Sequence, residues 1–263
     1  YHGWTFSKDG ILISGPKIKE AFTENQLSNK KLIKMKIAMC GKFIFITEIS
    51  NKESLENYLL SHFNQIKKIS MKFGNLVSSK RYIWKCNWKI AIENSIDEYH
   101  GPILHKSTFK KILILNPSYN YSSHVSEMSM PLQDSYLKFF LKTLTKPNLF
   151  VSKNYRHFFI FPISTIASTM DLFCYLQRYI PIDENNCIIE TDIFIPEVNI
   201  NNKDKTKFLI NSAKSFNEEI FNEDKEICES IHYNLRNGYK FFNIGKFEKR
   251  INFYRKLVRK FKI

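Results

Sequence analysis

The separation of strand-like and helix-like segments in the C-terminal half most constrains the fold of this 263-residue chain. Segments between Tyr155 and Ile195 alternate or run apolar, and a turn is predicted at residues 183–186. The following segment, residues 203–236, has helical spacing throughout and ends near Gly238. The pattern therefore predicts several β-strands followed by one long helix.

The rest of the chain reads as shorter elements joined by polar segments. Strand pairs are predicted within residues 1–14 and 37–49, and helices within residues 51–68, 88–99 and 246–263. We expect residues 16–34 to form a polar connector and residues 118–154 to be loop with some helix. The last helix is basic and amphipathic, and we expect it to pack on its own domain rather than on a membrane surface.

The net charge of +15 comes mostly from lysine. Lysine, isoleucine and asparagine are enriched together along the whole chain, which indicates a coding bias rather than a basic face for nucleic acid. We therefore expect no nucleic-acid partner, although a positive surface suits an acidic electron-transfer protein. No run of about 18 apolar residues occurs, so we also expect no membrane span.

The five cysteines are odd in number and form no Cys-x-x-Cys pair. This usage argues against a disulfide framework and for a reducing compartment. We therefore expect ordinary thiols and a cytoplasmic location.

Two histidines and one carboxylate lie close together in the middle of the chain, at Asp97, His100 and His105. Two imidazoles and one carboxylate on a single face of an iron ion leave positions open, which is the arrangement of non-haem Fe(II) oxygenases. A histidine pair with this spacing also arises by chance among seven histidines. Taken alone, the spacing leaves both interpretations open.

The surrounding segment, Asn87-Trp88-Lys89-x4-Asn94-x2-Asp97-x-Tyr99-His100-x4-His105, closely resembles the catalytic signature of the Rieske non-haem iron oxygenases, in their large ring-hydroxylating alpha subunit. The resemblance implies that His100 and His105 bind the iron. It also implies that Asp97 bridges to the Rieske cluster of a neighbouring subunit, and that Asn94 is a supporting residue nearby.

Two further segments resemble the same family. Tyr1-His2-Gly3-Trp4 resembles the second half of the Rieske motif, Cys-x-x-His-Gly-Trp, which implies that His2 is a cluster ligand. The other ligands would then lie upstream, so we expect an N-terminally truncated chain that cannot hold the cluster alone. Residues 223–229 resemble a late acidic helix of the form E-D-x4-E, which implies Asp224 as the third iron ligand, with Glu223 as the alternative.

The resemblance implies an α+β fold in two parts. Residues 1–50 would be the end of a small all-β Rieske domain, and residues 51–263 a helix-grip catalytic domain, in which an antiparallel sheet folds over a long helix. The cofactors would be a mononuclear Fe(II) and a [2Fe–2S] Rieske cluster. The partners would be a ferredoxin or flavin reductase, O₂, a small substrate and further copies of the chain, in a homotrimer or higher oligomer.

The implied reaction is hydroxylation or oxidative demethylation of a small organic molecule, with aromatic compounds among the candidates. Two alternatives remain open, an iron-free helix-grip module that binds a ligand and an inactive truncated oxygenase. The sequence identifies neither the substrate nor the choice between monooxygenase, dioxygenase and demethylase.

Overall fold

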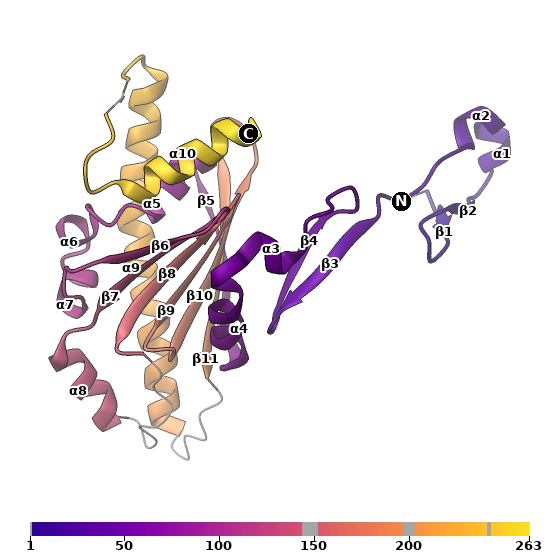
Figure 1. The fold of residues 1–263 in the computed structure, drawn as a ribbon. Coiled ribbons are helices and arrows are strands. Elements are labelled where there is room, and N and C mark those ends of the chain that lie inside the picture. The colour runs from indigo at the N-terminus through magenta and orange to yellow at the C-terminus, as the bar shows by residue number, and fades with distance from the viewer. Residues whose placement is uncertain (1, 144–151, 197–202, 241–242) are drawn as a thin grey trace.

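The computed structural model describes residues 2–143, 152–196, 203–240 and 243–263, and its centre is a seven-stranded antiparallel sheet (Figure 1). In spatial order the strands are β5 (Phe73–Trp84), β11 (Cys187–Pro196), β10 (Phe173–Pro181), β9 (Ser164–Thr169), β8 (Asn154–Ile160), β7 (Val125–Pro131) and β6 (Ser118–Tyr121). Neighbours in the sheet are also neighbours in the chain except at one edge, where β5 pairs with β11, so that Trp84 lies opposite Cys187. Among the described residues, no helix is both long and apolar enough to cross a membrane.

Side chains alternate between the two faces of this sheet, as the period of two requires. One face packs on α9 (Lys203–Arg236), the long helix that runs along the sheet (Figure 1). The opposite face packs on α3 (Leu55–Leu59), η1 (Leu60–His62) and α4 (Phe63–Met71). The long helix has the predicted bounds, and an antiparallel sheet folded over it confirms the predicted α+β arrangement.

The C-terminal helix α10 (Lys249–Phe261) covers one end of the sheet, together with α5 (Trp88–Ser95). Its apolar face is buried through Ile251, Tyr254 and Leu257, so the helix packs on the domain as predicted. The same face carries Arg250, whose side chain is completely buried.

The guanidinium of Arg250 is paired in several directions. It donates to the Glu98 carboxylate (Nη1–Oε1, 2.5 Å) and to the Ser126 hydroxyl (Nε–Oγ, 3.1 Å). Since Ser126 is on β7 and Glu98 follows α5, this one side chain joins three parts of the fold. A buried charge without such partners would cost several kcal/mol.

The N-terminal segment forms two small two-stranded sheets that lie to one side of the main sheet (Figure 1). Its elements are β1 (Thr5–Phe6), β2 (Leu12–Ser14), α1 (Ile18–Ala21), α2 (Glu24–Leu27), β3 (Met35–Cys40) and β4 (Phe43–Glu48). The predicted strand pairs within residues 1–14 and 37–49 are therefore confirmed. Cys40 and Phe43, at the tip of the second pair, share a hydrophobic core with α3 and α4.

The structure differs from the predicted local structure in three places. Residues 118–154 hold the strands β6 and β7 and the helix α8 (Asp134–Thr143), although residues 144–151 lie outside the described residues. β7 was hard to find because it carries polar residues that are buried, Ser126 and Glu127. The connector at residues 16–34 contains two short helices, and the long strand β5 was not predicted.

Two predicted helices are shorter than their sequence pattern. The helix expected over residues 51–68 starts on its Ser54 cap but breaks at Leu60, which has a positive φ of 47°. The helix expected over residues 88–99 ends at Ser95, and a bend follows it. This bend places the side chains of the following residues.

We predict that Arg250→Met lowers the free energy of unfolding by about 3–5 kcal/mol, because it leaves the Glu98 carboxylate buried without its partner. The double variant Arg250→Met/Glu98→Gln should recover part of this loss. Urea denaturation followed by circular dichroism measures both.

The control pair is Arg255 and Glu93, which joins the same helix to α5 at 2.6 Å but keeps both side chains partly exposed. Arg255→Met should cost about 1 kcal/mol or less. Equal losses for Arg250→Met and Arg255→Met would contradict the structural role of the buried pair.

Candidate metal centre

Helix α5 and the bend after it determine where Asp97 and His100 point. The helix begins on its Asn87 cap, whose side-chain oxygen accepts from the backbone N–H of Lys89. Just after the helix, Asp97 Oδ1 accepts from the backbone N–H of Tyr99 at 2.8 Å, a turn that aspartate favours. The other oxygen, Oδ2, lies 3.2 Å from His100 Nδ1. One carboxylate therefore shapes the bend and holds the imidazole that follows it.

A single helical turn, α6 (Gly101–Leu104), separates the two histidines. Pro102 stands in its first turn, where proline is compatible with a helix start. His100 precedes this turn and His105 follows it, and their Nε2 atoms approach to 3.2 Å. The short turn thus brings together two imidazoles that are five residues apart.

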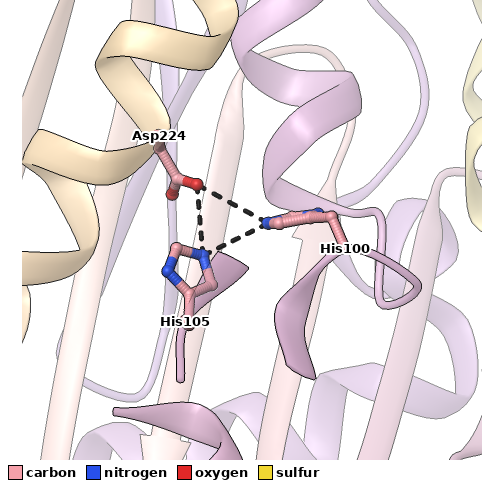
Figure 2. Close-up of side chains that lie close together, drawn as sticks. All are labelled: His100, His105 and Asp224. Carbon is pink, nitrogen blue, oxygen red and sulfur yellow. Dashed lines mark hydrogen bonds and ion pairs between the residues drawn. The ribbon is translucent and has the colours of Figure 1, made fainter. Parts of the chain in front are cut away.

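The third side chain, Asp224, comes from the middle of α9 (Figure 2). Its Oδ1 atom lies 3.1 Å from His105 Nε2 and 3.5 Å from His100 Nε2. The three atoms all lie within 4.8 Å of one another, and no other group of three His, Cys, Asp or Glu side chains in the described ranges meets this condition.

Each imidazole is held by a second carboxylate on its other nitrogen. Asp97 contacts His100 Nδ1, and Glu223 Oε2 lies 2.7 Å from His105 Nδ1. A carboxylate at Nδ1 favours the tautomer that carries its proton there, which leaves Nε2 free to bind a metal. Glu223, the alternative third ligand, therefore lies behind His105, whereas Asp224 faces both Nε2 atoms.

The chemistry of this set fits a divalent first-row metal. Asp224 Oδ1 is buried and makes no hydrogen bond of good geometry, but it lies within ion-pair distance of the Nε2 atoms of His105 and His100. Two histidines and one carboxylate are the ligands of non-haem Fe(II) sites. The residues present could therefore hold such an ion.

The pKa values of His100 and Asp224 are both shifted in the direction that favours positive charge between the three side chains. Burial lowers the pKa of His100, but the carboxylates of Asp224 and Asp97 outweigh it and raise the pKa to about 9. Burial raises the pKa of Asp224, but His100 and His105 outweigh it and lower the pKa to about 2. The site thus stabilises a cation between its side chains.

A cavity opens beside these three side chains, with an empty volume of about 810 Å³ that includes its opening to solvent. Its walls include seven aromatic and thioether side chains, namely Trp84, Phe109, Met128, Met130, Tyr155, Tyr179 and Phe221. Asn94 and Asp97 also line it, so these two predicted site residues lie beside the predicted ligands. A largely apolar cavity with a few polar groups is typical of a site for a small molecule.

His2 is the one predicted site residue that lies elsewhere. The N-terminus of the chain is on the opposite side of the molecule from α6 (Figure 1). The structure therefore does not bring His2 to His100 within one chain, and its role as a cluster ligand stays a prediction.

The sequence did not reveal the roles of two side chains, His157 and Glu223. His157 was expected to have a surface or packing role; it is buried, which agrees with packing, but it also lines the cavity, which was not predicted. The available signal was its position in a predicted strand, where it shares a face with the apolar Tyr155 and Phe159. Glu223 was considered only as a ligand, and nothing in the sequence indicated its contact with His105.

Comparisons with known proteins agree on one family. The family model for the ring hydroxylating alpha subunit (catalytic domain) matches residues 73–261. Choline monooxygenase from Amaranthus tricolor is 24% identical over 254 residues, which cover 89% of this chain and 51% of the relative. A glycine betaine monooxygenase oxygenase subunit from Pseudomonas aeruginosa is 25% identical over 114 residues, which cover 43% of this chain and 26% of the relative.

Solved structures share the fold. The quaternary ammonium Rieske monooxygenase CntA in complex with L-carnitine superposes with a TM-score of 0.72 at 16% sequence identity, over 99% of this chain and 70% of that one. The present chain spans about half the length of the choline monooxygenase that it matches.

We predict that Glu223→Gln weakens Fe(II) binding by about 10- to 100-fold, because the amide orients His105 less well than the carboxylate does. Asp224→Ala should abolish tight binding, since it removes one of the three ligand atoms. Anaerobic competition with a chelating dye measures both affinities.

The control is Glu226→Gln, an exposed position on the same helix. It should leave the affinity unchanged. A Glu223→Gln variant that binds iron as tightly as wild type would show that the 2.7 Å contact does not support the site.

Proposed function

The chain belongs to the ring-hydroxylating alpha subunits of the Rieske oxygenases, as its motifs predicted, and from this premise we propose that it carries their oxygenase reaction. The reaction would use O₂ and externally supplied electrons to hydroxylate or oxidatively demethylate a small organic substrate. Its site would be a mononuclear Fe(II) bound by His100, His105 and Asp224.

The observation that carries this proposal is the convergence of three ligand atoms beside a cavity. Two imidazole nitrogens and one buried carboxylate oxygen lie within 4.8 Å of one another, and the oxygen makes no hydrogen bond of good geometry. When bound there, Fe(II) would supply the redox chemistry that activates O₂.

The other residues of the site would position groups and exclude water. Asp97 would keep His100 in the orientation that presents Nε2, and Glu223 would do the same for His105. The aromatic walls would remove water from around the substrate and restrict its orientation, which is how proteins direct such reactions.

We further propose that the substrate carries an alkylammonium group. The relatives are named for choline, glycine betaine and carnitine, which are small ammonium compounds. Trp84, Tyr155 and Tyr179 line this cavity, and aromatic rings attract such cations. The same walls would also accept an aromatic ring, which is the second candidate.

The predicted partners of the reaction stay proposals. A ferredoxin or flavin reductase would supply the electrons, and the net charge of +15 would favour an acidic donor. Asp97 would bridge His100 to a [2Fe–2S] cluster that His2 of the partner subunit helps to hold, which requires a homotrimer or higher oligomer.

The division of the chain and its location are also proposals. We place the end of a Rieske domain in residues 1–50 and the catalytic domain in residues 51–263. The described cysteines are all free and buried, which supports a reducing compartment such as the cytoplasm.

We predict about one iron per chain after anaerobic loading with Fe(II), and the loss of that iron in the double variant His100→Ala/His105→Ala. Metal analysis gives the iron content, and electron paramagnetic resonance of the nitric oxide adduct reports a mononuclear ferrous site. His232→Ala is the control, since this half-buried histidine contacts Asn185 away from the cavity.

A wild-type chain that takes up no iron would contradict the proposed function and favour an iron-free ligand-binding module. Iron that remains in the double variant would contradict the assigned ligands instead.

A further inference from the structure

One part of the cavity wall is polar, and the metal centre does not account for it. Ser95, His157, Gln177 and Tyr179 all line the cavity, and we call them the polar patch. Gln177 Oε1 accepts from the Tyr179 hydroxyl at 3.1 Å and from the Thr165 hydroxyl at 2.8 Å. Polar groups in an apolar cavity commonly orient a ligand.

The buried Arg250 determines the tautomer of His157. Its Nη2 lies 3.0 Å from His157 Nδ1 and 3.3 Å from the His157 carbonyl oxygen. A guanidinium can only donate, so Nδ1 must accept. The proton of the neutral ring is then on Nε2, the nitrogen nearest Ser95.

His157 is also neutral. Burial and the positive charge of Arg250 lower the pKa of His157 well below its usual value. The ring therefore presents an N–H donor rather than a cation, and its orientation is fixed by a side chain from α10.

The donor is poorly satisfied within the protein. The separation between His157 Nε2 and Ser95 Oγ is 3.5 Å, at the outer limit for a hydrogen bond. A buried donor without a good acceptor costs about 1–3 kcal/mol, and a ligand oxygen placed there would recover part of that cost.

We propose that His157 is a specificity-determining residue, whose Nε2–H donates a hydrogen bond to an acceptor oxygen of the substrate. The oxygen belongs to a carboxylate, carbonyl or hydroxyl group. This inference rests on the proposed function, because it assumes that the substrate occupies the cavity beside His100, His105 and Asp224. If His157, on β8, binds this oxygen, the rest of the substrate can extend toward these three side chains, which line the same cavity.

The test compares two pairs of probes, each with and without an oxygen. The first pair is glycine betaine and tetramethylammonium, and the second is benzoate and toluene. Isothermal titration calorimetry on the Fe(II)-loaded chain, under anaerobic conditions, gives the four dissociation constants. We expect wild type to prefer the oxygen-bearing member in at least one pair.

In His157→Phe that preference should fall about 5- to 15-fold, the effect of losing one neutral hydrogen bond. Affinity for the probe without oxygen should not change. His157→Gln keeps an N–H donor and should retain most of the preference. His124→Phe is the control, since His124 is also buried but does not line the cavity.

A second measurement needs no variant, and it decides the matter if His157→Phe does not fold. Nitrogen-15 NMR of the histidine-labelled wild type, loaded with diamagnetic Zn²⁺, should show His157 as a neutral ring protonated on Nε2. Its Nε2 resonance should move when the preferred oxygen-bearing probe is added, and should not move with the partner probe that lacks oxygen.

An unchanged preference in a folded His157→Phe overturns the inference. So does the absence of any oxygen-dependent preference in both pairs, including the case in which no probe binds. Iron content is measured on the same samples. If iron is present, either of these two negative results contradicts the inference about His157 but not the proposed function. A preference that depends on His157 in a chain without iron would support the inference and contradict the proposed reaction.

Discussion

Packing of α9 against α5 is the contact on which the proposed metal centre depends. Phe221 and Cys228 stand about one turn before and after Asp224 on α9, and both are buried in the core that contains Ala91 of α5. Residues three and four apart on a helix share a face, so this packing turns Asp224 toward the bend after α5. His100 follows that bend, and the contact between the two helices therefore sets the distance between proposed ligands from remote parts of the chain.

Burial makes the charges around this contact mutually dependent. Asp97, Glu223 and Asp224 are acidic side chains beside two imidazoles, and such groups are stable in a low-dielectric site only when positive charge balances them. The same principle applies beneath the cavity, where Arg250 pairs with Glu98 and donates to His157. The C-terminal helix thereby supports both the bend that carries His100 and the sheet that lines the cavity.

Local patterns made the general arrangement predictable. The long helix and the strands between Tyr155 and Ile195 follow from periodicity, which depends on near neighbours in the sequence. His100 and His105 were predicted as iron ligands because their spacing and the residues before them resemble a family signature. Asp224 was placed by resemblance as well, and the structure brings it to both histidines.

What could not be predicted depends on contacts between distant segments. β7 has buried serine and glutamate residues because Arg250 and Arg156 bind them, and neither arginine is near β7 in the sequence. β5 is a strand because it pairs with β11, more than a hundred residues later. Glu223 and His157 acquire their contacts in the same way, through helix packing and through a side chain from the last helix.

The central claim is that His100, His105 and Asp224 bind one metal ion. Anomalous X-ray diffraction from crystals of the Fe(II)-loaded chain, recorded on both sides of the iron absorption edge, tests it most directly. One anomalous peak should lie between the two Nε2 atoms and the Asp224 carboxylate, at bonding distance from all three side chains. A peak elsewhere, or no peak in crystals that contain iron, would contradict it.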